Sequence, residues 1–162
     1  MTPWRYWLDF YMFPPIIVGA VIYDCRSWQW AALAVLGFVF WTFNEYRVHR
    51  SVLHRWLWHG THERHHDHPE EFVENIWWYT PLLFFLIFWV LPLSLYTGFA
   101  AGYVWFLTMH FWLPHTPLRP GTWIYRFALW HGLHHKFTTC NYGITTNIWD
   151  KVFRTSREPR HA

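Results

Sequence analysis

The sequence has little cysteine and little charge. Its two cysteines, Cys25 and Cys140, lie far apart and form no Cys-X-X-Cys pair. This excludes a zinc site built from thiolates and a four-cysteine iron–sulfur cluster. Charged residues make up 14% of the 162-residue chain, whereas an average globular chain has about 25%. The net charge is only +3, so we expect no nucleic-acid partner.

Long stretches of the chain carry no charge at all. Residues 76–114 contain no Asp, Glu, Lys or Arg. As one helix this run would be about 58 Å long, twice the hydrocarbon core of a bilayer at about 30 Å. It must therefore fold back on itself. Residues 92–98 hold the breakers for this reversal, which predicts two helices at roughly 79–95 and 99–114.

Two more uncharged stretches, 10–23 and 27–44, lie nearer the N-terminus and are separated by Asp24-Cys25-Arg26. The first is short and contains Pro14-Pro15, so we expect it to be kinked or to extend back over residues 4–8. Together the four stretches predict one all-α domain over residues 1–162. It would be an integral membrane domain with four transmembrane helices in two hairpins.

The distribution of Lys and Arg predicts the orientation of these hairpins. Twelve of the thirteen lie at the N-terminus, in the central loop or in the C-terminal segment, and only Arg26 lies in a turn between helices. The positive-inside rule places those three regions in the cytoplasm. The histidine-rich segments fall on the same face and form a helical cap there. We therefore expect a multi-pass protein of the bacterial inner membrane or the endoplasmic reticulum.

Ten of the thirteen histidines form a pattern that occurs twice: a pair, then a triplet at positions i, i+3 and i+4. Such a triplet points to one side of an α-helix. The pattern consists of His49, His54, His62, His65, His66, His110, His115, His131, His134 and His135.

Neutral imidazole is a common ligand for iron, zinc, copper and nickel. A catalytic zinc ion takes about three protein ligands, so ten histidines are too many for one such ion. They suit two metal ions with about five nitrogen ligands each and a position left open for dioxygen. The alternative is a histidine-rich segment that binds metal loosely or acts as a buffer.

The pairs need a separate explanation. Five positions along a regular helix separate His49 from His54 by about 140°. Either the helix is locally distorted, as π-bulges at functional sites often are, or the two residues reach different ions. His110 and His115 have the same spacing with Pro114 between them, which predicts a bend or a helix end there. Such a break would let both side chains turn toward one site.

These stretches resemble the membrane fatty acid hydroxylase/sterol desaturase superfamily of histidine-rich di-metal oxygenases. The resemblance covers about residues 33–156 and rests on the four histidine groups in order, on residues 44–50, and on the tail Asn141-Tyr142-Gly143 with residues 149–155. One feature differs. Four residues separate His110 from His115, whereas three are common in the fatty acid hydroxylases; four is more similar to bacterial carotenoid (β-carotene) hydroxylases.

The resemblance implies that the ten histidines hold two iron ions, which zinc could replace in purified material. Ligating imidazoles need an acceptor for their second ring nitrogen. Glu45, Glu63, Asp67 and Asp150 are candidates for this role. For Asn141 and Asp150 the alternative is a turn and a cap that shape the site from outside.

The expected function is that of a non-haem di-iron oxygenase that hydroxylates a lipid with dioxygen. As the substrate, a fatty acyl chain is favoured over a carotenoid or a sterol. A desaturase of the same superfamily is the enzymatic alternative. A metal-binding membrane protein without enzymatic activity is the alternative from another class. The sequence has no flavin, haem or ferredoxin motif, so a separate electron donor of the cytochrome b5 or ferredoxin type is implied.

Overall fold

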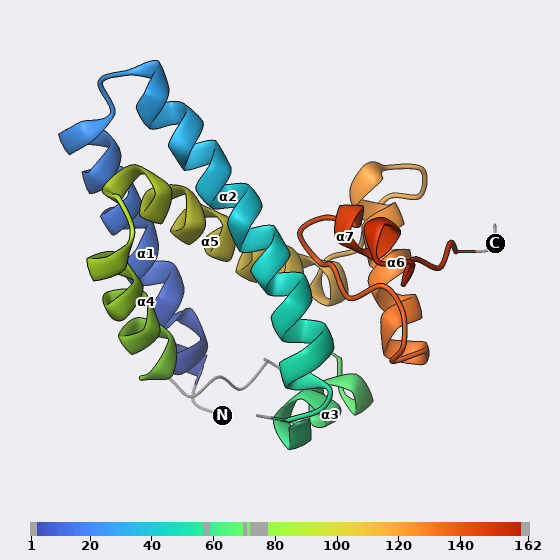
Figure 1. Ribbon diagram of the computed structural model, residues 1–162. Coiled ribbons are helices and arrows are strands. Elements are labelled where there is room, and N and C mark those ends of the chain that lie inside the picture. The colour runs from blue at the N-terminus through green and yellow to red at the C-terminus, as the bar shows by residue number, and fades with distance from the viewer. Residues whose placement is uncertain (1–2, 57–58, 70, 72–77, 160–162) are drawn as a thin grey trace. The chain divides into compact units, whose positions relative to one another are not determined.

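The computed structural model describes residues 3–56, 59–69, 71 and 78–159, and these contain helices and no strand (Figure 1). The prediction of an all-α fold is therefore confirmed for this part of the chain. In order, the elements are α1 (Pro3–Asp24), α2 (Trp28–Val48), the π-helical turn η1 (His49–Leu53), α3 (His59–Asp67), α4 (Tyr79–Val90), α5 (Leu93–His115), α6 (Trp123–Lys136) and α7 (Ile148–Val152).

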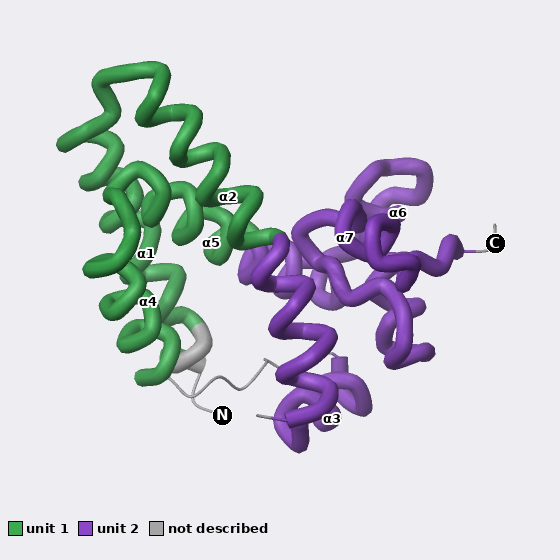
Figure 2. The backbone as a smooth tube through the Cα atoms, in the orientation of Figure 1, with its two compact units in different colours: residues 1–42, 73–105 green, residues 43–72, 106–162 purple. Residues whose placement is uncertain are grey.

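The chain forms two compact units, coloured separately in Figure 2. Unit 1 comprises residues 1–42 and 73–105, and holds α1, α4, most of α2 and the first half of α5. Unit 2 comprises residues 43–72 and 106–162, and holds η1, α3, α6, α7 and the remaining ends of α2 and α5. All ten histidines of the repeated pattern belong to unit 2.

Unit 1 has an aromatic core centred on Phe84 of α4, which is 2% exposed. Its ring centroid lies 4.5 Å from that of Phe13 in α1, 4.9 Å from that of Tyr103 in α5 and 6.2 Å from that of Trp41 in α2. Aromatic side chains from all four helices of the unit therefore meet at one point. Burial of such rings is among the largest apolar contributions to stability.

The reversal within the uncharged run is shorter than predicted. α4 ends at Val90 and α5 begins at Leu93, so the reversal expected over residues 92–98 is wrong in extent. Pro92 alone accounts for the break, because a residue before proline is held in the extended conformation, as Leu91 is here. Gly98 does not break the helix but allows α5 to pack closely against α2, because a Cβ on it would lie 1.7 Å from the carbonyl oxygen of Ala34.

α1 is one helix that includes Pro14 and Pro15 and begins at Pro3. The expectation that the first uncharged stretch extends back over residues 4–8 is therefore confirmed. Its turn into α2 is closed by a hydrogen bond from the Trp30 indole to a carboxylate oxygen of Asp24, 2.9 Å apart.

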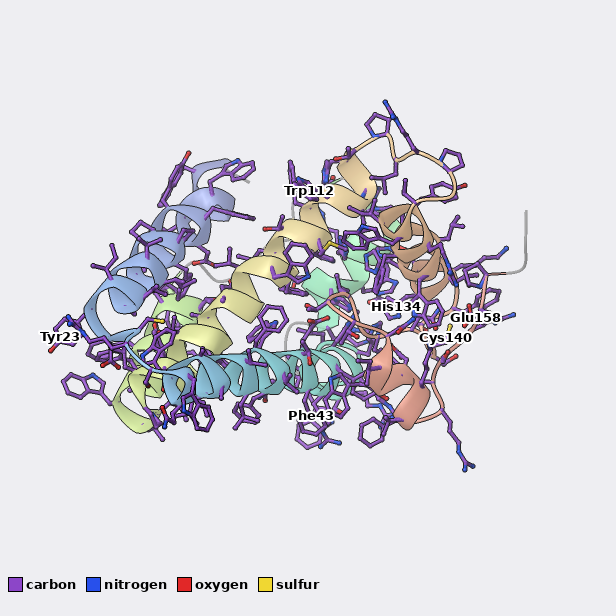
Figure 3. All side chains as sticks on the ribbon, turned by 90° about the horizontal axis from the view of Figure 1, so that it is seen from above. Tyr23, Phe43, Trp112, His134, Cys140 and Glu158 are labelled. Carbon is purple, nitrogen blue, oxygen red and sulfur yellow. The ribbon has the colours of Figure 1, made fainter. Side chains whose placement is uncertain are left out.

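Within the described residues, no helix combines the length and the apolar character needed to span a membrane. Unit 1 nevertheless exposes many large apolar side chains. At the outer end of α1, Tyr23 points away from the helix (Figure 3). The most exposed are at least 65% accessible: Tyr11, Ile22, Tyr23, Trp28, Val35, Trp89 and Val90.

Candidate metal centre

The first histidine pair lies on a local distortion of the helix. α2 passes into the π-helical turn η1 at His49, and His54 follows directly after it. A π-helix forms i to i+5 hydrogen bonds, so residues five apart approach one another. The ring centroids of His49 and His54 lie 5.2 Å apart with an interplanar angle of 24°. Of the two explanations for this pair, the π-helical distortion is therefore the one observed.

Each triplet lies on one helix, as the spacing predicts. α3 holds the first triplet and α6 holds the second. Thr122 precedes α6 as its N-cap: its hydroxyl accepts a hydrogen bond from the backbone N–H of Tyr125. The triplet histidines face the interior of unit 2: His62, His65, His131 and His134 are each at most 6% exposed.

Five histidines bring one ring nitrogen each to within 4.8 Å of the others: His49, His54, His62, His66 and His134. We call these the five-histidine set. The Nε2 atom of His62 lies 3.0 Å from that of His49, 3.1 Å from that of His54 and 3.2 Å from that of His66. Two ligands about 2.1 Å from one ion, at angles near 90–110°, would lie about 3.0–3.4 Å apart.

Hydrogen bonds among these rings cannot account for the packing around His62. An imidazole nitrogen carries either one hydrogen or one lone pair in the ring plane, so it cannot satisfy three neighbouring nitrogens at once. A cation placed among them would accept all the lone pairs. The donor set of this site therefore fits a metal ion.

The second ring nitrogens of two members fix the tautomer. The Nδ1 atom of His49 lies 2.6 Å from the carbonyl oxygen of Tyr142. Nδ1 of His134 lies 2.7 Å from that of Cys140, and both of these residues are labelled in Figure 3. A carbonyl oxygen only accepts, so Nδ1 carries the hydrogen in both rings. Each Nε2 then presents its lone pair to the set, which is how metal-ligating histidines are held.

Three further histidines form a second group, the three-histidine set: His65, His131 and His135. The Nε2 atoms of His131 and His135 lie 3.0 Å apart. Both ring nitrogens of His65 are buried without a hydrogen-bond partner, as is Nδ1 of His131 and of His135. Buried polar atoms rarely stay unpaired, so this group also fits a metal ion. The two sets adjoin, because the rings of His66 and His135 stack with centroids 4.5 Å apart.

His110 lies beside the three-histidine set. It is 8% exposed, and its ring centroid lies 4.6 Å from that of His65 and 5.3 Å from that of His131. Its predicted partner, His115, is exposed, belongs to neither set, and donates from Nδ1 to the carbonyl oxygen of Phe111 at 2.8 Å. A ligand role for His115 stays a prediction.

The different placement of these two histidines follows from the helix. α5 includes Pro114 and ends at His115, so the helix end predicted near this proline is confirmed, but the helix does not break between His110 and His115. A proline in the last turn removes one backbone hydrogen bond only, and the helix tolerates this loss at its end. On a regular helix the two side chains stay about 140° apart. His49 and His54 lie closer together because η1 is a π-helix.

Burial determines the charge of these rings. It lowers the pKa of His54 and His135 to about 4 and that of His65 to about 3. The positive charges that neighbouring histidines would carry lower these pKa values further. Burial is also the main cause that lowers the pKa values of five further rings: His49, His62, His110, His131 and His134. The rings are therefore neutral at pH 7, which is the form that binds metal.

The carbonyls that hold His49 and His134 belong to a loop that Asp150 fixes in place. Asp150 is 0% exposed, and burial raises its pKa. Its Oδ1 accepts from the backbone N–H of Tyr142 at 2.9 Å, and its Oδ2 accepts from that of Gly143 at 2.8 Å. Asp150 thus acts on the imidazoles through the loop, which matches the alternative of a residue that shapes the site from outside.

Asn141 and Glu45 hold the two ends of the same loop. Asn141 has a left-handed backbone with φ of 56°, and its amide donates to the carbonyl of Arg157 at 2.9 Å and accepts from the N–H of Arg157 at 2.7 Å. Glu45 Oε1 accepts from the N–H groups of Ile144 and Thr145 at 2.6 and 2.9 Å. Burial raises the pKa of Glu45 to about 7, although these hydrogen bonds oppose the shift.

The two acidic candidates on α3 are placed differently. Asp67 and Glu63 are both exposed. Burial lowers the pKa of His66, and the negative charges of Asp67 and Glu63 oppose that shift. Glu63 also lies 3.5 Å from Nδ1 of His59, a histidine outside both sets.

One group that contributes to the site was missed by sequence reasoning: the hydroxyl of Tyr46. It accepts from Arg50 at 2.7 Å and lies 3.1 Å from the hydroxyl of Thr155, which in turn donates to Oδ1 of Asp150 at 2.7 Å. Because Thr155 gives its hydrogen to the carboxylate, Tyr46 must donate to Thr155. The spacing of Tyr46 and Arg50, one helical turn apart, was the signal in the sequence.

Comparison with known proteins agrees with this site. A family model described as "Fatty acid hydroxylase" matches residues 34–155, which include all ten histidines. The chain is 29% identical over 180 residues to dihydroceramide fatty acyl 2-hydroxylase of Arabidopsis thaliana, covering 96% of this chain and 74% of the relative. It is 29% identical over 144 residues to fatty acid 2-hydroxylase of Mus musculus, covering 76% of this chain and 39% of that protein.

A more distant relative and a solved structure also match. Delta(7)-sterol 5(6)-desaturase of Eremothecium gossypii is 26% identical over 99% of this chain and 47% of its own length. The structure of full-length scs7p, in which only the hydroxylase domain is visible, superposes with a TM-score of 0.75 at 27% identity. That match covers 96% of this chain and 68% of the other. The chain thus spans between 39% and 74% of the length of the sequence relatives named here.

Proposed function

Because the chain belongs to the fatty acid hydroxylase family, we propose that it adds a hydroxyl group to the fatty acyl chain of a lipid. The observation that carries this proposal is the pair of adjoining histidine sets in unit 2, whose nitrogens fit two metal ions. The names of the two hydroxylases above favour carbon 2 of the acyl chain as the position attacked.

The residues that would hold the metal are the five-histidine set for one ion and the three-histidine set with His110 for the other; His115 is proposed as a further ligand. Iron is the metal we propose, and zinc could replace it on purification. Bound iron would supply dioxygen activation and the removal of hydrogen from an unactivated C–H bond.

The protein's own part in this reaction is to hold neutral imidazoles in place. The carbonyls of Cys140 and Tyr142 take the Nδ1 hydrogens of His134 and His49, so these rings cannot rotate without losing a buried hydrogen bond. Burial keeps four of the remaining rings, those of His62, His65, His110 and His131, away from water and neutral. A metal site assembled in this way needs no rearrangement before substrate arrives.

We further propose that the protein lies in a membrane, with unit 1 in contact with lipid. The exposed apolar side chains of α1, α2 and α4 support this, because monomeric soluble proteins rarely expose large contiguous apolar surfaces. The arrangement of Lys and Arg in the sequence favours the cytoplasmic face of the endoplasmic reticulum or of a bacterial inner membrane for the metal centre. A lipid substrate would then reach it from the bilayer.

The electrons are proposed to come from a separate donor of the cytochrome b5 or ferredoxin type. The exposed cations Arg47, Arg55 and Lys136 lie within two residues of histidines of the two sets. They would attract a donor with an acidic surface.

A second candidate function is desaturation, favoured by the match to a sterol desaturase. One experiment separates the alternatives: the protein is incubated with fatty acyl lipids, dioxygen and an electron donor, and the lipids are analysed by mass spectrometry. Gain of one oxygen supports hydroxylation, and loss of two hydrogens supports desaturation. His134→Ala is expected to abolish the product, and His59→Ala, which changes an exposed histidine outside both sets, should retain it. A protein that forms neither product and binds metal in variable amounts would be a metal-binding protein only.

A further inference from the structure

A groove on unit 2, separate from the two histidine sets, has the chemistry of an anion site. Its volume is about 250 Å³. One wall is a face of α6 with residues at positions i, i+3, i+4 and i+7, and the other is formed by Asn147, just before α7, and by Lys151 within α7. The lining residues are Trp123, Arg126, Phe127, Trp130, Asn147 and Lys151.

The charges in this groove are of one sign. Arg126 and Lys151 are both exposed, and no carboxylate lines the groove. Among the described residues, neither cation takes part in an ion pair. Two unpaired cations facing one hollow favour an anionic ligand, and a guanidinium binds phosphate oxygens well.

One residue of the groove wall has a buried donor. Trp130 is 5% exposed, and its indole Nε1 has no hydrogen-bond partner among the described residues. An indole N–H can only donate, and a buried donor without a partner is costly. This nitrogen is closed to water-sized molecules, so it makes no contact with a ligand in the groove as the structure stands.

The surroundings of the groove indicate the source of the anion. Trp123, Ile148 and Val152 are each more than half exposed, and the last two flank Lys151 on α7. Exposed tryptophan and aliphatic side chains beside Arg and Lys are typical of a surface that lies in the headgroup region of a membrane. Whole-ligand pockets usually have about 300–1,000 Å³, so this groove suits a headgroup rather than an entire lipid.

We propose that this groove binds the phosphate headgroup of an anionic phospholipid and thereby holds unit 2 against the membrane surface. The proposal rests on the membrane location given under the proposed function. It assigns Arg126 and Lys151 a role in lipid binding that is independent of the metal centre.

The test is native mass spectrometry of the full chain in detergent, titrated with phosphatidylglycerol or with zwitterionic phosphatidylcholine. We expect tighter binding of phosphatidylglycerol. Arg126→Gln/Lys151→Gln should weaken that binding about 25-fold, since each cation near an anionic surface contributes about fivefold. The control Arg26→Gln/Arg119→Gln removes as much charge outside the groove and should change it by less than about twofold.

Three results would overturn the proposal. These are equal affinity for the two lipids, equal losses in the groove and control variants, and displacement of phosphatidylglycerol by inorganic phosphate as effective as displacement by a short-chain phosphatidylglycerol. Loss of electron transfer in the groove variant with unchanged lipid binding would also overturn it, in favour of an acidic protein partner. Metal content is measured on the same samples and should be unchanged. A protein that binds phosphatidylglycerol through the groove and modifies no lipid would refute the hydroxylase and leave the groove standing.

Discussion

Asp150 is the residue whose replacement tests the support of the metal centre most sharply. In Asp150→Asn, one carboxylate oxygen becomes an NH₂ group. Oδ1 accepts two hydrogen bonds, from the Tyr142 N–H and from the Thr155 hydroxyl, and Oδ2 accepts one, from the Gly143 N–H. The amide oxygen is therefore expected at the Oδ1 position, which leaves the NH₂ group facing the Gly143 N–H.

The cost can be worked out from these contacts. A buried donor that faces another donor costs about 1–3 kcal/mol, and the two remaining hydrogen bonds lose the benefit of a charged acceptor. The relief of burying a charge offsets part of this, because burial raises the pKa of Asp150. We expect the free energy of unfolding to fall by about 2–4 kcal/mol. Since the same loop holds His49 and His134, metal affinity should also fall about tenfold to a hundredfold.

The assay is thermal and denaturant unfolding in detergent, combined with metal content after dialysis against graded chelator concentrations. Asp67→Asn is the matched control, because it makes the same chemical change at an exposed position on α3. It should alter stability by less than about 0.5 kcal/mol. Wild-type stability and metal affinity in Asp150→Asn, or equal losses in both variants, would refute the reasoning.

Further predictions concern two glycines and pH. Gly143→Ala would place a Cβ 2.1 Å from a carbonyl oxygen of its own loop, so we expect loss of bound metal and of stability, whereas Gly132→Ala, with open space around it, should keep both. Gly98→Ala would place a Cβ 1.7 Å from a carbonyl oxygen of α2. It should lower the unfolding midpoint by the equivalent of about 1–3 kcal/mol or more, and Gly19→Ala, which meets nothing, should leave the midpoint unchanged or raise it. The pKa values of the buried histidines are lower in the folded state than their ordinary 6.5, two of them to about 4. The stability of the metal-free protein should therefore be full above pH 6.5 and should be lost as pH falls through 4, as acid unfolding would measure; unchanged stability at pH 4 would contradict this.

The sequence predicted what depends on local spacing. The triplets on α3 and α6 are groups of three because residues at i, i+3 and i+4 of a helix share a face, and this needs no tertiary information. The π-helical turn at His49 was one of two explanations for the first pair, and only the structure distinguished them. The sequence could not predict how each triplet is divided between the two sets. His66 belongs to the five-histidine set, whereas its neighbour His65 belongs to the three-histidine set.

Two features depended on contacts between distant residues and so escaped prediction. Gly98 looked like a helix breaker, but its place inside α5 follows from the close approach of Ala34. The acceptors for His49 and His134 are backbone carbonyls, and a carbonyl has no signature in the sequence because every residue carries one. The carboxylates of Glu45 and Asp150 were visible in the sequence, whereas their action through the loop N–H groups was not.

The most direct test of the account is the number of metal ions per chain in freshly purified protein, with His134→Ala and His131→Ala measured beside it. Two adjoining histidine sets predict about two ions per wild-type chain and a defined loss when a member of either set is removed. A ratio of one ion or fewer, or a variable ratio that neither substitution changes, would contradict the two-metal centre.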